Sequence, residues 1–281
     1  MGMFFQAEAA MRILEWSQFT QGRFFADRKT AVTIGVFDGV HRGHQVLIDR
    51  IVKKGPELTP MVITFRQSPK GFLKKQDWSG DILSLDRKLV IFENLGVAAV
   101  VLIDFSINFS KLTGKEFLEL LRIRGNPGYA AIGGDFRCGY RMDTDAVRIK
   151  ALNGEAGIPT DVVEPIADRP NELPGGHTQR ISSSRIRAAI SLGELSRAAA
   201  MLGRNVEFDF TGLESGVRPG GRFYGTAAAH RVIPAEGRYP VLLYEKGSAA
   251  GIQAEITVEK DGILVPPQFE AERVEFLTGD A

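Results

Sequence analysis

Short apolar runs recur along the first part of the chain, and most of them lack polar alternation. They cover residues 31–36, 60–65, 97–103, 129–133 and 160–166. Runs of this length are typical of strands buried on both faces. Segments with helical spacing lie between them, at residues 46–52, 86–95, 117–121 and 144–156. This alternation of strand and helix predicts a parallel, doubly wound α/β sheet with helices on each side, a Rossmann-like domain.

The pattern changes near residue 205. Two short helices are expected at about 183–191 and 194–203, and glycine and proline then become dense. Short stretches with alternating polarity follow, such as YPVLLYE, AEITVE and RVEFL. Such stretches predict a small antiparallel β domain, in the form of a partial barrel. We therefore expect two domains, comprising residues 1–204 and 205–281.

Composition narrows the classes of function. Hydrophobic residues make up 44% of the 281 residues and charged residues 25%, as in an ordinary globular protein. The formal net charge of +1 gives no general reason to expect nucleic acid or an anionic membrane as a partner. No apolar run is long enough to span a bilayer, and Glu8 comes too early for a signal peptide. We expect a cytoplasmic protein.

The single cysteine, Cys138, excludes an intramolecular disulfide and a cysteine-based metal cluster. This fits a reducing cytosol. Zinc binding by histidine is also disfavoured, because His177 and His230 are far from the other two histidines in sequence and no H-E-x-x-H pattern occurs. We expect no resident metal site.

The most informative segment is GVFDGVHRGH at residues 35–44, between a buried strand and a helix. In an open α/β sheet, ligands bind beyond the carboxyl ends of the strands. Gly39 and Gly43 allow a tight turn and a close approach to a ligand. The start of the following helix offers free N–H groups and a positive dipole end, which suit an anion.

Two of the four histidines, His41 and His44, lie in this segment. At a spacing of three residues they can face one pocket, where each can donate a hydrogen bond to a phosphate oxygen. Preorganised donors of this kind are the main catalytic device in phosphoryl and nucleotidyl transfer. A lone histidine is usually structural or exposed, but a pair within a glycine turn favours a functional interpretation.

On these residues the chain resembles the prokaryotic bifunctional riboflavin kinase/FAD synthetases. Its first part resembles their FMN adenylyltransferase module, one of the H-x-G-H nucleotidylyltransferases. The resemblance implies that ATP and FMN are substrates, that FAD is a product and that Mg²⁺ accompanies ATP. It implies catalytic roles for His41 and His44, and contacts to ATP from Gly35, Phe37, Asp38, Gly39 and Gly43.

A second matching segment is ISSSRIR at residues 181–187, which is similar to the family's I-S-S-T-x-I-R. Hydroxyl and N–H groups at a helix start bind anions. By resemblance, Ser182, Ser183 and Ser184 contact ATP, and Arg187 holds the departing pyrophosphate as a third catalytic residue. The plain alternative is a serine N-cap followed by a solvated arginine.

A third segment, GGDFRCG at residues 133–139, looks like the family's G-x-D-F-R-F-G. It implies an ATP contact from Asp135 and flavin contacts from Phe136 and Arg137; Asp135 could instead simply cap a turn. Phe65 is expected at the flavin too, although its surroundings depart from the family. Arg66 and Ser68 stand where the family's F-[DE]-P-H-P has an acid and a histidine.

The second domain departs further from the family, whose riboflavin kinase signature is G-F-P-T-A-N. The best match is YGTAA at residues 224–228, where Gly225 replaces the proline and Ala228 the asparagine. An alanine methyl cannot ligate a hard cation, which requires oxygen. We therefore expect a degenerate kinase domain, with a scaffolding or flavin-retaining role.

Three alternatives stay open: a bifunctional enzyme, a non-catalytic flavin- or nucleotide-binding protein, and an enzyme of the same fold with another acceptor. The intact His41, Gly43, His44 and Arg187 oppose a loss of catalysis. The late ISSSRIR and the appended β domain oppose a different acceptor. The oligomeric state cannot be inferred from the sequence.

Overall fold

The computed structural model describes residues 10–72, 79–106, 109–168 and 179–278. These residues form two compact units. The first takes its described residues from Met1–Phe37, His44–Phe72 and Leu89–Pro165, and the second from Asp38–Gly43, Leu73–Lys88 and Ile166–Ala281. The segment 38–43 thus belongs with residues far from it in sequence. The boundary expected after residue 204 stays a prediction.

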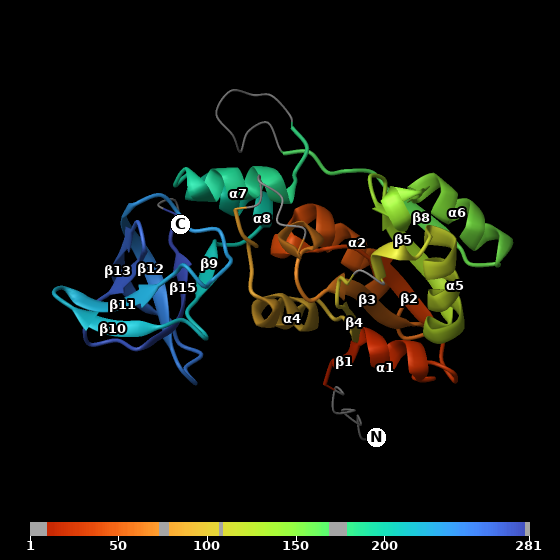
Figure 1. Ribbon diagram of the computed structural model, residues 1–281, viewed down its shortest axis with the longest axis horizontal. Coiled ribbons are helices and arrows are strands. Elements are labelled where there is room, and N and C mark those ends of the chain that lie inside the picture. Colours follow the sequence, from red (N-terminus) through yellow and green to blue (C-terminus); the bar gives the residue numbers. More distant parts are fainter. Residues whose placement is uncertain (1–9, 73–78, 107–108, 169–178, 279–281) are drawn as a thin grey trace, which may run out of the picture. The chain divides into compact units, whose positions relative to one another are not determined.

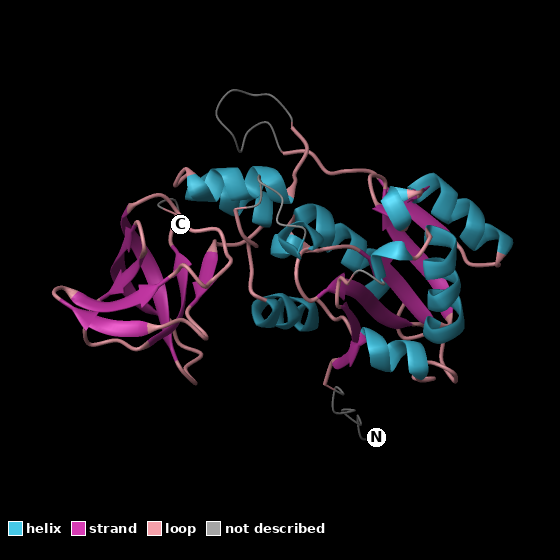
Figure 2. Ribbon diagram, in the orientation of Figure 1, coloured by secondary structure: helices cyan, strands magenta, loops and turns pink. Residues whose placement is uncertain are grey.

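A six-stranded parallel sheet forms the centre of the first unit (Figures 1 and 2). Its strands in spatial order are β1 (Arg12–Glu15), β4 (Ala99–Ile103), β3 (Thr59–Phe65), β2 (Thr30–Ile34), β5 (Pro127–Gly133) and β8 (Thr160–Val163). The chain adds strands on one side of β2 and then, from β5 onward, on the other side. The parallel doubly wound sheet expected from the sequence is confirmed. Its strand order reverses beside β2, where ligands bind in folds of this type.

Both faces of this sheet are buried. Every residue of β2 and β4 is buried, as the uninterrupted apolar runs predict. One face packs against α1 (Trp16–Gln21), α5 (Gly114–Gly125) and α6 (Ala146–Glu155) through residues such as Phe19, Phe117 and Ile149. Helix α2 (Arg42–Val52), which follows β2, lies across the sheet from α5 and α6 (Figure 1). The shorter helix α3 spans Pro69–Phe72.

Several short elements of the first unit, among them β1 and α1, were not anticipated from the sequence. The edge strand β1 reads RILE, and only Leu14 is buried, so it shows no apolar run. Helix α1 has only six residues. The segment expected to be helical at 144–156 begins with a short strand, β7 (Thr144–Asp145), which pairs with β6 (Arg137–Cys138) before α6 starts.

The second unit contains a seven-stranded antiparallel sheet, curved into the partial barrel that the sequence predicts (Figure 1). Its strands in spatial order are β10 (Ser215–Arg218), β11 (Gly221–Gly225), β14 (Gly262–Val265), β13 (Ile252–Glu259), β12 (Gly237–Glu245), β15 (Ala271–Phe276) and β9 (Glu207–Asp209). We call residues 205–278 the β module. Two helices precede it, α7 (Ser183–Ser191) and α8 (Leu195–Leu202). Helix α4 (Leu85–Asn94) begins in the second unit and ends in the first.

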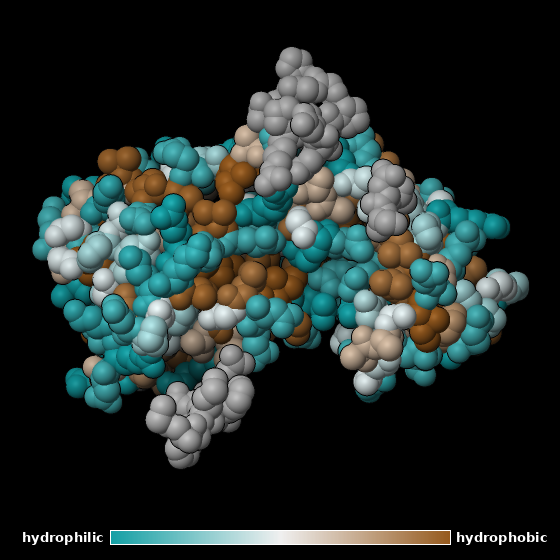
Figure 3. Space-filling view, turned by 180° about the vertical axis from the view of Figure 1, so that it is seen from behind, coloured by the Kyte–Doolittle hydropathy of each residue, from teal (hydrophilic) through white to brown (hydrophobic). Residues whose placement is uncertain are grey.

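None of the helices in the described ranges is long and apolar enough to cross a membrane. The face seen in Figure 3 is largely hydrophilic, with brown apolar areas among the polar residues.

We predict a stability loss of about 1 kcal/mol when Thr113 is replaced by alanine, because it caps α5. The Thr113 hydroxyl accepts from the Glu116 N–H at 3.3 Å, and the Glu116 carboxylate accepts from the Thr113 N–H at 2.8 Å. Urea unfolding of Thr113→Ala and of the matched Thr113→Ser measures the effect. Serine keeps the hydroxyl, so Thr113→Ser should retain most of the stability. Equal losses in the two variants would mean that the capping box does not stabilise α5.

Candidate functional site

The loop that follows β2 has an unusual backbone. Phe37, Gly39 and Val40 have φ angles of 51°, 78° and 40°, respectively. A positive φ is strained for any residue with a side chain, and most of all for a β-branched one. Such strain persists only where the surroundings impose it, and it gathers at functional sites. The loop thus carries a physical sign of function that is separate from its sequence motif.

Glycine is required within this turn. A Cβ on Gly39 would come within 2.9 Å of the Ile82 Cδ1 atom and 3.3 Å of the Leu202 Cδ2 atom. Gly43, at the start of α2, is also restricted, since a Cβ there would lie 3.2 Å from two ring atoms of His41. Both glycines thus allow a close approach between parts of this chain, while their close approach to a ligand stays a prediction. The partner at each is a side chain of this chain.

Asp38 is the buried anchor of the loop. One of its carboxylate oxygens accepts from the Ile82 N–H at 2.8 Å, and the other accepts from Arg187 Nη2 at 2.5 Å. Burial raises the pKa of Asp38, and the charges of Arg187 and Lys88 act in the opposite direction. Both partners of the ion pair are buried, with side-chain exposures of 6% and 9%. Breaking such a pair by removing one partner is strongly destabilising.

The three backbone carbonyls of η1 (Asp38–Val40) also accept hydrogen bonds from side chains. Ser183 Oγ donates to the Asp38 carbonyl at 2.9 Å. Arg204 donates to the carbonyls of Gly39 at 2.7 Å and Val40 at 3.3 Å. Residues from 145 to 165 positions away in sequence thus fix this turn. The sequence alone predicts no role for Arg204, because nothing local in it indicates this one.

The predicted residues of the ISSSRIR segment divide into three kinds. Ser182 is the N-cap of α7, and its hydroxyl accepts from the Arg185 N–H at 3.4 Å. Ser183 and Arg187 hold the loop, and Arg187 Nε also donates to the Gly80 carbonyl at 2.8 Å. Ser184 is exposed. Arg187 was expected to be a phosphate ligand; its guanidinium also bonds to Asp38 and Gly80, so it takes part in fixing the loop.

The two histidines differ in their surroundings. His41 is buried, with 6% exposure, and precedes α2 directly. His44 is half-buried in the first turn of α2, and its ring packs edge-on against Phe37 at a centroid distance of 5.1 Å. Phe37 is fully buried and also contacts Phe92 edge-on at 5.7 Å. The strained Phe37 backbone therefore serves to place an aromatic wall beside His44.

The GGDFRCG segment lies at the carboxyl end of β5. Gly35 directly follows β2, and Gly133 is the last residue of the neighbouring strand β5. Asp135 and Arg137 are exposed, and Phe136 is half-buried against the core of the first unit. The carboxyl end of this strand thus offers a carboxylate and a guanidinium to solvent.

Aromatic rings gather beyond β3 and β4 in the first unit. Phe65 ends β3, and its ring centroid lies 6.0 Å from those of Phe105 and Phe109. Phe105 in turn contacts Phe72 at 5.6 Å. Phe72 is 46% exposed, so this cluster, which we call the phenylalanine cluster (Phe65, Phe72, Phe105, Phe109), reaches the surface.

Arg66, which replaces an acidic residue of the resembled family, is paired with two carboxylates. Its guanidinium bonds to Glu15 and lies 3.3 Å from Asp104. The side chain is 40% exposed. These partners come from the carboxyl ends of β1 and β4, so Arg66 ties the ends of neighbouring strands beside the phenylalanine cluster.

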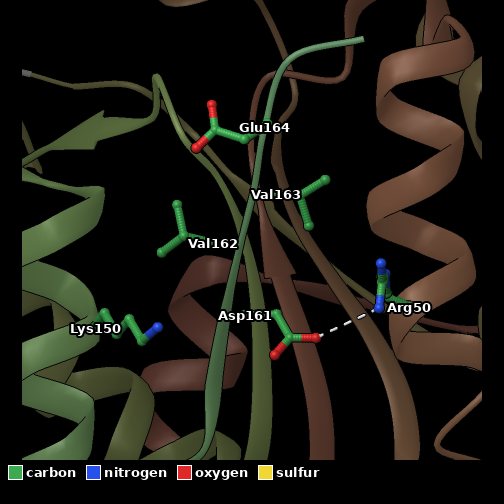
Figure 4. A pocket seen from close by; sticks show the side chains of 6 residues that line it. All are labelled: Arg50, Lys150, Asp161, Val162, Val163 and Glu164. Carbon is green, nitrogen blue, oxygen red and sulfur yellow. Dashed lines mark ion pairs between the residues drawn. The ribbon is translucent and has the colours of Figure 1, made fainter.

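A separate pocket of about 370 Å³ lies along the edge strand β8 (Figure 4). It is lined by Arg50, Lys150, Asp161, Val162, Val163 and Glu164. Asp161 lies 3.8 Å from Arg50 and accepts from the Tyr129 hydroxyl at 2.6 Å. None of the residues predicted for the ATP or flavin site lines this pocket. Among the described residues, no group of three or more His, Cys, Asp or Glu side chains lies together in the manner of a metal site.

The pH dependence of stability tests whether Lys88 is buried beside Asp38 as a charged group. Burial lowers its pKa to about 8, and the charges of Asp38 and Asp81 oppose that shift. Between pH 8 and 10.5 the unfolded chain therefore binds more protons at this residue than the folded chain. The contribution of Lys88 to the free energy of unfolding should therefore rise with pH in that range, by about 1 kcal/mol per pH unit.

Urea unfolding at pH 8, 9 and 10 of wild type and Lys88→Met measures this contribution. The wild-type free energy of unfolding should increase relative to that of the variant as pH rises. Other groups that titrate in this range cancel in the difference. A difference that stays flat, or falls, would show that the Lys88 ammonium is not held at a cost in the folded protein.

Comparison with known proteins adds to this geometry. One relative is the "Bifunctional riboflavin kinase/FMN adenylyltransferase" of Bacillus subtilis (strain 168). It is 31% identical over 180 residues, which are 63% of this chain and 54% of the relative. Its namesake from Escherichia coli (strain K12) is 29% identical over 175 residues, which are 61% and 53% of the two chains. The matched region thus spans about half the length of these relatives.

A crystal structure titled "Macrolide-efflux Protein" from Streptococcus pneumoniae superposes with a TM-score of 0.71 at 24% identity. It covers 95% of this chain and 97% of its own, which shows that the whole fold recurs. The family model for FAD synthetase matches residues 25–183, more than half of the chain. These residues run from before β2 to the first residue of α7 and include the strained loop. The chain belongs to the FAD synthetase family.

Proposed function

We propose that this protein is an FMN adenylyltransferase, which transfers AMP from ATP to the phosphate of FMN and releases FAD and pyrophosphate. The observation that carries the proposal is the strained GVFDGVHRGH loop, at the carboxyl end of the central strand where the strand order reverses. Membership of the FAD synthetase family and the names of the bacterial relatives support it.

The proposed reaction is an in-line displacement. An FMN phosphate oxygen attacks the α-phosphorus of ATP, the bond from that phosphorus to the bridging oxygen breaks, and pyrophosphate leaves. The FMN phosphate is already a dianion, so the attack requires no general base. The protein then contributes position and charge stabilisation. Mg²⁺ belongs to the proposal as a companion of ATP, with phosphate oxygens and water as its ligands.

In this proposal His41 and His44 donate to phosphate oxygens as negative charge develops on them. The start of α2 adds its N–H groups and its dipole. The remaining ATP contacts are Gly35, Phe37, Asp38, Gly39 and Gly43 in the loop, Asp135 after β5, and Ser182 to Ser184 at the start of α7. For Asp38 and Ser183 the contacts described above favour an indirect role, in which they hold the loop that receives ATP.

Arg187 remains in the proposal as a cation for the pyrophosphate. Its ion pair with Asp38 also gives it a positioning role, because the same guanidinium fixes the loop. The two roles predict different effects of an Arg187→Lys substitution: charge alone serves the pyrophosphate, whereas positioning of the loop requires the guanidinium. Lysine would keep the charge but not the fork that bonds to both Asp38 and Gly80.

The phenylalanine cluster is the apolar surface that we propose for the flavin ring. Phe65, which was expected at the flavin, contacts two of its members. Offset or edge contacts between aromatic rings contribute about 0.5–1.5 kcal/mol each beyond the area they bury. Phe136 and Arg137 are proposed to complete the flavin contacts from the carboxyl end of β5.

We further propose that the β module has lost riboflavin kinase activity. Ala228 lies exposed after β11, where the kinase signature has an amide that can contact Mg²⁺. Glu275, the nearest candidate for an acidic base, is ion-paired with Arg273. A bifunctional enzyme is the alternative, favoured by the names of the relatives. Location in the cytoplasm stays a prediction.

Three incubations test the activity. Purified protein with ATP, Mg²⁺ and FMN should yield FAD, as resolved by chromatography, and the same mixture with riboflavin should yield neither FMN nor FAD. Formation of FMN from riboflavin would support the bifunctional alternative. An absence of FAD in the first mixture, with tight flavin binding retained, would identify a non-catalytic flavin-binding protein. Replacing FMN by phosphopantetheine tests another acceptor.

His44→Ala should lower kcat for FAD formation by about 10²–10³, the scale found when a transition-state donor is removed. Steady-state kinetics with both substrates measures this. The matched control is Asp49→Ala, an exposed residue of the same helix whose ion pair with Lys53 is also exposed. Wild-type kcat in His44→Ala would remove His44 from the mechanism.

Phe72→Ala should raise KM for FMN by about 10-fold, equivalent to about 1.4 kcal/mol, with little change in KM for ATP. Phe24→Ala is the control, because Phe24 has a similar exposure of 41% and is not a member of the phenylalanine cluster. An equal KM for FMN in both variants would place the flavin elsewhere.

A further inference from the structure

One short segment contacts both residues 38–43 of the strained loop and the β module, and all three belong to the second unit. The segment consists of Gly80, Asp81 and Ile82, and we call it the strap. The main-chain N–H and carbonyl groups of the strap form these contacts as hydrogen bonds. Such bonds are directional, so the position of the strap determines the position of the groups bonded to it.

On one side the strap holds the Asp38–Arg187 pair. The Ile82 N–H donates to an Asp38 carboxylate oxygen at 2.8 Å, and the Gly80 carbonyl accepts from Arg187 Nε at 2.8 Å. Gly80 and Ile82 therefore grip both members of the ion pair that fixes the loop. If the strap moves, both groups lose a partner in a buried setting, where an unmade hydrogen bond is costly.

On the other side the strap pairs with the β module. The Asp81 N–H donates to the His230 carbonyl at 2.9 Å, and the Val232 N–H donates to the Asp81 carbonyl at 3.0 Å. These two bonds form a parallel bridge between Asp81 and Arg231. The strap thus pairs with the β module through a single parallel β-bridge.

Arg231 is itself anchored in the β module. Its guanidinium forms an ion pair with Asp209 and lies 4.4 Å from the centre of the Phe208 ring. Both side chains of the ion pair are buried, at 7% and 8% exposure. The loop that receives the strap is therefore fixed to β9, and a continuous set of contacts leads from β9 to Asp38.

We propose that the β module acts as a positioning device for adenylyl transfer, through the strap that holds Asp38 and Arg187 in place. The inference rests on the proposed function, since it assigns the strained loop to that reaction. It gives the β module a role that requires no kinase chemistry. It also assigns positioning roles to Gly80, Arg231 and Asp209.

Gly80 offers a sharp test. It has a φ of +108°, and a Cβ there would lie 2.5 to 2.8 Å from three backbone atoms of Arg231. Backbone atoms cannot yield as a flexible side chain can, so Gly80→Ala should force the strap away from the β module. Gly212→Ala is the matched control: Gly212 has a φ of +75° in the β module, but a Cβ there would meet no atom within 4 Å.

We expect Gly80→Ala to lower kcat for FAD formation at least 10-fold, with KM for FMN changed less than twofold. Gly212→Ala should keep wild-type kinetics. Asp209→Asn, which weakens the Arg231 anchor without a steric clash, should lower kcat in the same direction by a smaller factor, and it serves if Gly80→Ala does not fold. Wild-type kcat in Asp209→Asn and in a folded Gly80→Ala would overturn the proposal.

Hydrogen exchange followed by mass spectrometry tests the inference without any assay of activity. Peptides covering residues 38–43 should exchange faster in Gly80→Ala than in wild type, while peptides from β3 and β4 stay unchanged. Unchanged exchange at 38–43 would overturn the inference even if FAD is formed. If wild type forms no FAD but the exchange changes as expected, the proposed function fails and the coupling of the strap to the loop stands.

Discussion

The buried carboxylate of Asp38 is the contact on which the candidate site depends. A charged group in a nonpolar setting must be matched by a cation and by hydrogen bonds, or it will not stay charged. Here Arg187 provides the cation and Ile82 an N–H, while Lys88 adds charge nearby. Because Asp38 and these partners come from three separate parts of the chain, around residues 38, 82–88 and 187, the cost of burying one carboxylate fixes how those parts are joined. Positive φ angles such as those at Phe37 and Val40 persist where the surroundings impose them.

Much of the α/β fold could be predicted from the sequence. The strands β2 and β4 are buried on both faces, so their uninterrupted apolar runs predict them. The capping box formed by Thr113 and Glu116 predicts the start of α5. The edge strand β1 could not be predicted, because only one of its four residues is buried and the pattern carries no signal. The partial barrel followed from alternating polarity and dense glycine, although the pairing order of its strands did not.

The site was predictable in location but less so in chemistry. The glycines and histidines of residues 35–44 identify the turn after β2, because their spacing is local. The partner of Arg187 lies 149 positions away, so no local pattern could distinguish a guanidinium that binds phosphate from one that binds Asp38. The same limit applies to Arg204, which follows the helix expected at 194–203, and to Lys88, a lysine in a helix that would ordinarily face water.

The side chains that hold the strained loop come late in the sequence, and this affects when the loop can fold during synthesis of the chain. Ribosomes make the chain from its amino end, and domains generally fold as units while this proceeds. The parallel sheet can pair β2 with β3 early and with β5 once residue 133 has emerged, but the side chains of Ser183, Arg187 and Arg204 come much later. A nascent chain that already holds its sheet would therefore still have an unshaped turn after β2. The turn that we propose to receive ATP would therefore take its final shape late, when the last of these three side chains has left the ribosome.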